Sequence, residues 1–406
     1  MRLRSGFGEE EKMELCKIID KFIEIYGGSK DDLRIFTSPG RVNLIGEHTD
    51  YNGGYVFPAA LTMKTTIVAR KRNDDKIVMR ATDLDVVVEA DINRLDDYKG
   101  IKWGDYQLGV ASELKKEGYD IVGADLLYDD TVPHGGGLSS SAAIEVSTAL
   151  MFATFSNEKN NKNEQIDMIK MAKISQMAEH NYIGVKCGIM DQFASAMGKK
   201  DHAIFLDCKT LDYKYAPINF EGKKLILTNT NKKHALGASK YNERREECEK
   251  GLEILKKAMP EKTCLGEISY DEFQAHKHLI TDPVVEKRVE HVICECDRVL
   301  RSVKALEEGD IVKFGKLMNE SHDSLKNLYE VTGDELDTLA YEARKIDGVL
   351  GSRMTGAGFG GCTVSIVEDG AVDKFIEEVG KNYTAKTGLT ASFYISEIGD
   401  GGREVK

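Results

Sequence analysis

One stretch rich in glycine and serine constrains this chain more than any other. Residues 133–143 read Pro-His-Gly-Gly-Gly-Leu-Ser-Ser-Ser-Ala-Ala, and the following Ile-Glu-Val and Ala-Leu predict a helix. Consecutive glycines permit positive φ and let the backbone approach a ligand closely. A glycine-rich turn that leads into a helix directs unpaired N–H groups and the positive end of the helix dipole at one point. This arrangement suits phosphate.

The same stretch allows other interpretations. It has no lysine after the glycines, so it is not a Walker A loop. Taken alone, it could be a surface turn. The hydroxyls of Ser139, Ser140 and Ser141 add hydrogen-bond donors and a candidate oxygen ligand for Mg²⁺, and two further stretches favour the phosphate site.

Composition excludes several classes of protein. The chain has 406 residues, of which 41% are hydrophobic and 31% charged, as in a globular protein of two or three domains. The net charge of -12 argues against nucleic acid and anionic membranes as partners. We find no apolar run long enough to cross a bilayer and expect a cytoplasmic protein. The eight cysteines have no repeated spacing, and we expect free thiols.

A second stretch, residues 36–54, places several acceptors between apolar flanks. A short predicted strand carries Arg41 and ends in a loop with Glu47, His48 and Asp50, before a Gly-Gly pair turns the chain back. Such a loop could be a solvated hairpin. Its carboxylates and imidazole suit the hydroxyls of a sugar, because each carboxylate oxygen can accept from a separate O–H.

A third cluster follows a predicted helix at residues 166–182. Glu179 lies at the end of that helix, and Asp191 lies among apolar residues, where an unpartnered carboxylate would be costly. The alternative for Asp191 is an N-cap of the segment 192–197.

Near the C-terminus, residues 351–362 form another glycine-rich segment. Its spacing resembles a dinucleotide fingerprint, but it leads into a strand, whereas that fingerprint leaves a strand and opens a helix. We therefore reject a dinucleotide site. The only tryptophan, Trp103, could belong to the core or stack on a base, and the sequence alone favours the core.

Together these segments resemble the GHMP small-molecule kinases. Residues 40–54 are similar to the signature of the galactokinase family, residues 133–143 to the ATP-binding motif of the superfamily, and residues 351–362 to its third motif. The resemblance implies an α+β, two-domain GHMP kinase fold with the active site in the interdomain cleft. It also implies an N-terminal domain at residues 1–218 and a ferredoxin-like α+β C-terminal domain at residues 219–406.

The resemblance further implies roles for individual residues. Asp191 would orient or deprotonate the anomeric hydroxyl, and Arg41 would hold Asp191 ionised and stabilise the transferring phosphoryl group. Sugar binding is expected from Glu47, His48, Asp50, Gly188 and Tyr241. ATP binding is expected from Trp103, which matches a position near the adenine, and from Gly135, Gly136, Gly137, Leu138, Ser139, Ser140 and Ser141. The Mg²⁺ ligands would be Ser140 and Glu179.

The implied activity is phosphorylation of α-D-galactose at its anomeric hydroxyl by ATP and Mg²⁺. It would place the chain at the entry of galactose into central metabolism, as a monomer or weak homo-oligomer with small-molecule partners. One alternative is a kinase for N-acetylgalactosamine or another sugar. Another is a non-catalytic galactose and ATP sensor, against which the intact Ser139 to Ala143 segment argues. A mevalonate- or homoserine-type kinase is disfavoured by the polar cluster at residues 47–50.

Overall fold

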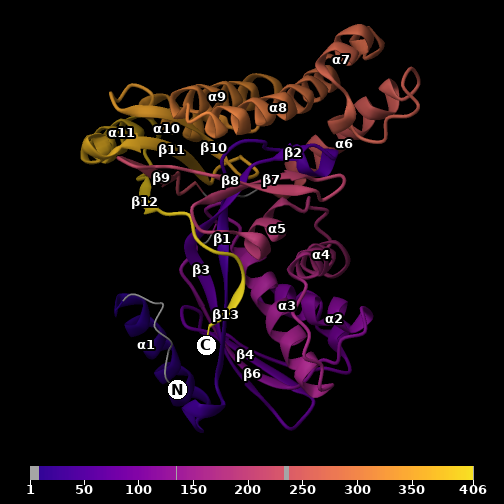
Figure 1. Ribbon diagram of the computed structural model, residues 1–406, viewed down its shortest axis with the longest axis vertical. Coiled ribbons are helices and arrows are strands. Elements are labelled where there is room, and N and C mark those ends of the chain that lie inside the picture. Colours follow the sequence, from indigo (N-terminus) through magenta and orange to yellow (C-terminus); the bar gives the residue numbers. More distant parts are fainter. Residues whose placement is uncertain (1–8, 134, 233–236, 406) are drawn as a thin grey trace.

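The computed structural model describes residues 9–133, 135–232 and 237–405, so His134 of the glycine-rich stretch lies outside the described residues. The two larger of the three described sheets, each covered by helices on both faces, are stacked along the long axis of the molecule (Figure 1). The α+β class expected from the sequence is confirmed. No described helix combines the length and the apolar character needed to cross a membrane.

The lower sheet in Figure 1 has six strands in the order β13-β1-β3-β6-β4-β5. Its strands are β1 (Arg34–Asn43), β3 (Pro58–Lys71), β4 (Lys76–Ala81), β5 (Val87–Asp91), β6 (Ala124–Asp130) and β13 (Arg403–Val405). Only the β4–β6 pair among them is parallel in the described chain. The last strand, β13, was not predicted, and it joins the end of the chain to β1.

Alternating side chains let this sheet bury both faces. Ile35 of β1 packs with α1 (Glu9–Tyr26), whereas the next residue, Phe36, packs in the cluster that includes helices α2 to α4. Successive residues of a strand point to opposite faces, so an unbroken apolar strand requires a helix on each side. Helix α1 covers one face, and the other face is covered by α2 (Asp105–Lys116), α3 (Ser140–Lys159) and α4 (Met168–Ala178).

The upper sheet is antiparallel, in the order β10-β11-β9-β12. Its strands are β9 (Lys223–Asn229), β10 (Val349–Thr355), β11 (Cys362–Glu368) and β12 (Ser392–Ser396). One face packs on α8 (Pro283–Glu307) and α9 (Ile311–Ser324), and the other on α10 (Gly333–Ala343) and α11 (Val372–Thr387). The glycines of residues 356–361 join β10 to β11, which is consistent with our rejection of a dinucleotide fingerprint.

A third, smaller sheet has the strand order β2-β7-β8 and consists of β2 (Tyr55–Val56), β7 (His202–Asp207) and β8 (Tyr213–Pro217). The remaining described α-helices are α5 (Met190–Met197), α6 (Gly237–Leu255) and α7 (Tyr270–His276). The division at residues 218 and 219 stays a prediction. Strand β13 belongs to the second half of the chain by sequence, but it pairs with β1 of the lower sheet, which the first half forms.

Candidate active site

The three glycine-containing stretches meet at one place. The backbone N–H of Arg41 donates to the carbonyl of Leu138 over 3.0 Å, so β1 is tied to the loop that precedes α3. Gly356 has a φ of +86°, and a Cβ built there would lie 2.8 Å from the carbonyl oxygen of Gly137. A side chain at residue 356 would therefore collide with the loop backbone.

The start of α3 has the features of an anion site. The helix begins at Ser140, and Ser139 before it has a φ of 62° and makes no side-chain cap. Gly135 and Gly137 also have positive φ. Because the N-cap side chain is used elsewhere, the first N–H groups of α3 stay available to an anion.

Asp191 is held between two partners. The carboxylate oxygen Oδ1 accepts from Arg41 Nε over 2.9 Å and lies 2.8 Å from Arg41 Nη2, while Oδ2 accepts from Ser139 Oγ over 2.6 Å. Arg41 Nη1 also donates to the carbonyl of Gly137 over 2.7 Å. The phosphate-type loop thus fixes both residues. The N-cap interpretation of Asp191 is wrong, because α5 begins at Met190 and its N-cap is Ile189.

Two buried carboxylates lie behind this pair. Gln192 Nε2 donates to Glu145 Oε2 over 3.0 Å and to Glu179 Oε1 over 3.2 Å. Burial, followed by the charge of Asp191, raises the pKa of Glu179 to about 7. Burial and the neighbouring Glu179 raise the pKa of Glu145 well above its usual range. The charged forms of both carboxyl groups are therefore disfavoured here unless a cation approaches them.

The carboxylates suit a hard divalent cation. Ser141 Oγ, rather than Ser140, donates to Glu179 Oε1 over 3.5 Å. Oxygen donors of this kind suit Mg²⁺, which keeps part of its coordination for water and phosphate oxygens. The described residues contain no group of three or more His, Cys, Asp or Glu side chains that could hold a metal by themselves. The donor set fits a cation that arrives with a nucleotide.

A cavity of about 260 Å³ opens beside Asp191. It is lined from both halves of the chain by Arg41, Glu47, His48, Asp50, Tyr51, Ser141, Glu179, Val185, Cys187, Gly188, Met190, Asp191, Tyr241, Asn242, Gly356 and Ala357. The expected sugar residues Glu47, His48, Asp50, Gly188 and Tyr241 are all among them, as are Arg41 and Asp191.

Asp50 and Gly188 form one wall of the cavity. A Cβ on Gly188 would lie 1.8 Å from Asp50 Oδ2, so only glycine fits beside this carboxylate. Burial, followed by the charge of Asp191, raises the pKa of Asp50 to about 6. The carboxylate is ionised at neutral pH and can accept from hydroxyl groups.

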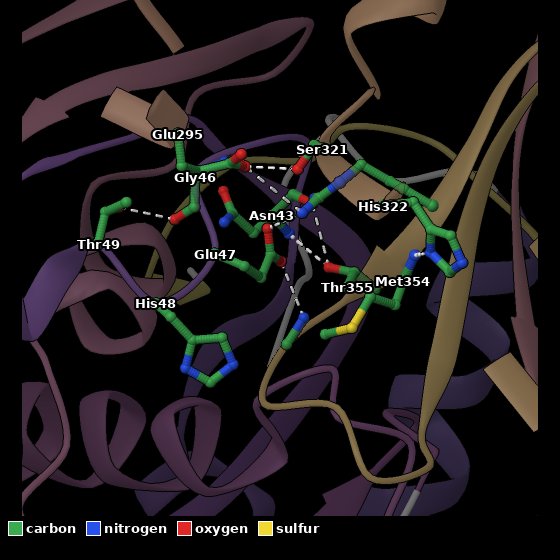
Figure 2. Close-up of polar contacts among 12 residues, drawn as sticks. Asn43, Gly46, Glu47, His48, Thr49, Glu295, Ser321, His322, Met354 and Thr355 are labelled. Atoms are coloured by element: carbon green, nitrogen blue, oxygen red, sulfur yellow. Dashed lines mark hydrogen bonds and ion pairs between the residues drawn. The ribbon is translucent and has the colours of Figure 1, made fainter. Parts of the chain in front are cut away.

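Glu47 is anchored from the second half of the chain, as Figure 2 shows. Its Oε1 accepts from the N–H of Gly356 over 2.9 Å, and its Oε2 pairs with Arg353 Nη2. Both side chains are almost fully buried. Arg353 was not singled out from the sequence, because nothing near residue 353 indicates a partner 306 positions away.

His48 has a fixed tautomer. Its Nε2 lies 3.2 Å from the carbonyl of Ala357, which can only accept, and its Nδ1 lies 2.9 Å from Tyr51 Oη. Burial lowers the pKa of His48 to about 3, so the ring is neutral, with hydrogen on Nε2 and Nδ1 accepting from Tyr51. Tyr51 Oη in turn lies 2.8 Å from Tyr329 Oη. The tyrosines therefore fix the orientation of the imidazole.

Trp103 lies apart from the cavity lining. It sits in a short helix, Lys102–Gly104, and packs edge-on against Tyr128 of β6, with ring centroids 5.7 Å apart. It is partly buried beside the core of the lower sheet. Strand β6 leads towards the glycine-rich loop, and the role of Trp103 beside an adenine stays a prediction.

Three family models match the chain. The galactokinase galactose-binding signature matches residues 20–71, the GHMP kinase N-terminal domain residues 105–199, and the GHMP kinase C-terminal domain residues 302–385. The galactokinase of Clostridium acetobutylicum is 48% identical over 397 residues, which cover 97% of this chain and 100% of the relative. The galactokinase of Bacillus subtilis is 46% identical over 382 residues, covering 93% and 96%.

Solved structures give the same result. The crystal structure of Lactococcus lactis galactokinase complexed with galactose superposes with a TM-score of 0.89 at 42% identity, covering 96% of this chain and 99% of that one. The mevalonate kinase of Methanococcus jannaschii, at 18% identity, has a TM-score of 0.65 over 92% and 100% of the two chains, and shares the fold.

The fold, the glycine-rich loop before α3 and the two matching domains define a GHMP-type ATP-dependent kinase. Within that class the galactose-binding signature and the full-length relatives are specific. The chain belongs to the galactokinase family.

Proposed function

We propose that this chain transfers the γ-phosphoryl group of ATP to the anomeric hydroxyl of α-D-galactose, giving galactose 1-phosphate and ADP. The observation that carries the proposal is the Arg41–Asp191–Ser139 contact, which joins the phosphate-type loop to the wall of the cavity. A group that accepts from a sugar hydroxyl is thereby held next to a site for the phosphate chain.

In this mechanism Asp191 accepts a hydrogen bond from the anomeric hydroxyl and orients its oxygen towards the γ-phosphorus. The new P–O bond forms as the bond to the ADP oxygen breaks, and the hydroxyl proton leaves on the side of Asp191. The transition state of phosphoryl transfer is loose, so positioning and charge stabilisation supply most of the catalysis. Arg41, which already contacts Asp191, supplies positive charge on this side.

The sugar would be held at the opposite end of the cavity. Glu47 and Asp50 accept hydroxyl hydrogens, and Tyr241 and the neutral His48 complete the wall. Of these side chains, Glu47 and His48 are almost fully buried. A site built to hydrogen-bond hydroxyls rejects sugars that lack them.

The phosphates would lie over residues 135–141, at the N-terminus of α3. Mg²⁺ held at this end would supply positive charge that offsets the charge of the phosphates during transfer. Ser141 and Glu179 are the side chains that would hold it, because they lie together at the excess of carboxylates.

A coupled assay of ADP release tests the proposal, with ATP and Mg²⁺ against galactose, N-acetylgalactosamine, glucose, arabinose and mevalonate. We expect strong turnover on galactose alone. Preference for N-acetylgalactosamine would show that the proposed substrate is wrong and that the proposed reaction class, a sugar kinase, is right. Binding of galactose seen by calorimetry, without turnover on any sugar, would favour a non-catalytic sensor over an enzyme.

A further inference from the structure

Glu47 lies on the cavity wall, but the groups that hold it come from outside the cavity. Arg353 pairs with Glu47 Oε2 and donates from Nη1 to the carbonyl of Asn43 over 3.1 Å. Arg353 Nη2 also lies 3.9 Å from Glu295 Oε1. Arg353 is fully buried and is not among the residues that line the cavity.

Glu295 of α8 holds the same loop from a second direction. Its Oε1 accepts from the N–H of Gly46 over 3.0 Å and from Ser321 Oγ over 2.5 Å, and its Oε2 pairs with Arg298. The two carboxylates and the two arginines balance each other in charge. Figure 2 shows Glu47, Glu295 and Ser321 close together in this network of charges and hydrogen bonds.

The physical consequence concerns the state of Glu47. A buried carboxylate that loses its arginine partner is strongly destabilised and either takes up a proton or moves. A protonated carboxyl has one donor and fewer acceptor sites. Arg353 therefore maintains the form and the position in which Glu47 can accept from a sugar hydroxyl.

We propose that Arg353 is a positioning residue for the sugar, acting through Glu47, with Glu295 as its second support. This inference rests on the proposed function, since it takes galactose as the molecule in the cavity. It assigns part of the sugar affinity to β10, a strand of the upper sheet that contributes no residue to the cavity lining.

The test compares Arg353→Met, Arg353→Lys and Glu47→Gln with the unaltered chain. We expect Arg353→Met to raise the galactose KM and the calorimetric Kd by about tenfold or more, because a buried partner is left unpaired. The KM for ATP and kcat should each change by less than about threefold. Arg353→Lys, which keeps the charge, should recover part of the loss.

A matched control comes from Arg288. It is equally buried and pairs with Glu247 over 2.8 Å and Glu330 over 2.7 Å, but it does not line the cavity. Arg288→Met should lower Tm and leave the galactose KM unchanged. If Arg353→Met does not fold, Arg353→Lys and Glu295→Gln carry the test, and both should weaken galactose binding.

A panel of galactoses that each lack one hydroxyl separates positioning from general damage. In Glu47→Gln, the sugar that lacks the hydroxyl bound by Glu47 should show no further loss of affinity. Arg353→Lys should likewise cause no further loss of affinity for that sugar. Equal losses across the panel, or a galactose KM unchanged in every Arg353 variant, would overturn the inference alone. Absence of galactose turnover by the unaltered chain would overturn the proposed function and the inference with it.

Discussion

The two ends of the cavity differ in how their charges are balanced. At the end formed by the loop after β1, Glu47 pairs with Arg353 and Glu295 pairs with Arg298. At the end formed by the start of α3, carboxylates gather around a single arginine. Of the described residues that line the cavity, Glu179 and Asp191 belong to this end, and Arg41 is the one arginine in the lining.

The difference shows at which end the chain supplies partners for its own charged groups. At the sugar end Glu47 pairs with Arg353, and the imidazole of His48 is held uncharged by burial, with hydrogen bonds that fix its orientation. Such preorganisation lowers the entropic cost of binding. At the phosphate end, burial and the charge of Asp191 raise the pKa of Glu179 to about 7, so the charged form of this carboxyl is disfavoured unless a cation approaches it. The predictions below set these two ends against each other.

Asp191→Asn should have the largest effect, because Asp191 is the residue on which both ends converge. Removing the charged acceptor should lower kcat by about 10² to 10⁴. Binding of ATP, measured by calorimetry, should stay within a few-fold, since the amide keeps the shape and Gly137 still accepts from Arg41. Turnover at the unaltered rate would show that Asp191 has no part in the transfer.

Ser141→Ala and Ser140→Ala separate the two serines at the phosphate end. Of these two hydroxyls, it is that of Ser141 that donates to Glu179 in the described structure. Its loss should therefore raise the Mg²⁺ concentration needed for half-maximal rate by about tenfold, the cost of one ligand or of its supporting contact. Ser140→Ala should change this concentration less. A titration of rate against Mg²⁺ at saturating ATP measures both, and the reverse order would return the role to Ser140.

This pair of serines also shows where prediction from the sequence stops. The three polar stretches, their helices and their convergence were predictable, because glycine runs and unpartnered carboxylates in apolar surroundings have local causes. Which of three consecutive serines faces Glu179 depends on where α3 begins, since successive helical residues differ in direction by about 100°. A boundary shift of one residue changes the answer.

Contacts between residues far apart in the sequence could not be predicted, for a different reason. Arg353 lies in β10, within a segment noticed only for its glycines, and its partner is fixed by the packing of the upper sheet on the loop after β1. Strand β13 has only 3 residues and no pattern of its own, so its pairing with β1 could not be foreseen. Such contacts follow from tertiary structure.

Glycine substitutions compare the two ends directly. Gly188→Ala places a methyl group against the Asp50 carboxylate, so the galactose KM should rise by about tenfold or more, with the KM for ATP little changed. Gly135 has a φ of +68° and open space around a Cβ, so Gly135→Ala brings backbone strain of about 1 kcal/mol and a several-fold rise in the KM for ATP. Steady-state kinetics on both substrates measure the two. Equal effects of each variant on both substrates would mean that the two ends are not separable.

The smallest expected effect is a dependence on pH at the sugar end. The pKa of Asp50 is raised to about 6 by burial and by the charge of Asp191, with Arg41 opposing this. The folded state therefore holds this proton more tightly than the unfolded state, so the contribution of Asp50 to stability is full at low pH and is lost as pH rises through about 6. Asp50→Asn should be more stable than the unaltered chain at neutral pH by roughly 1–3 kcal/mol, and this difference should shrink towards pH of about 4.

Binding should show the opposite trend, because the ionised carboxylate is the better acceptor for hydroxyl groups. Galactose affinity of the unaltered chain should fall about twofold between pH of about 7 and about 6, as half of Asp50 becomes protonated. Denaturant unfolding and calorimetry over this range measure the two trends. Parallel stability curves for Asp50→Asn and the unaltered chain would mean that folding does not change the pKa of Asp50.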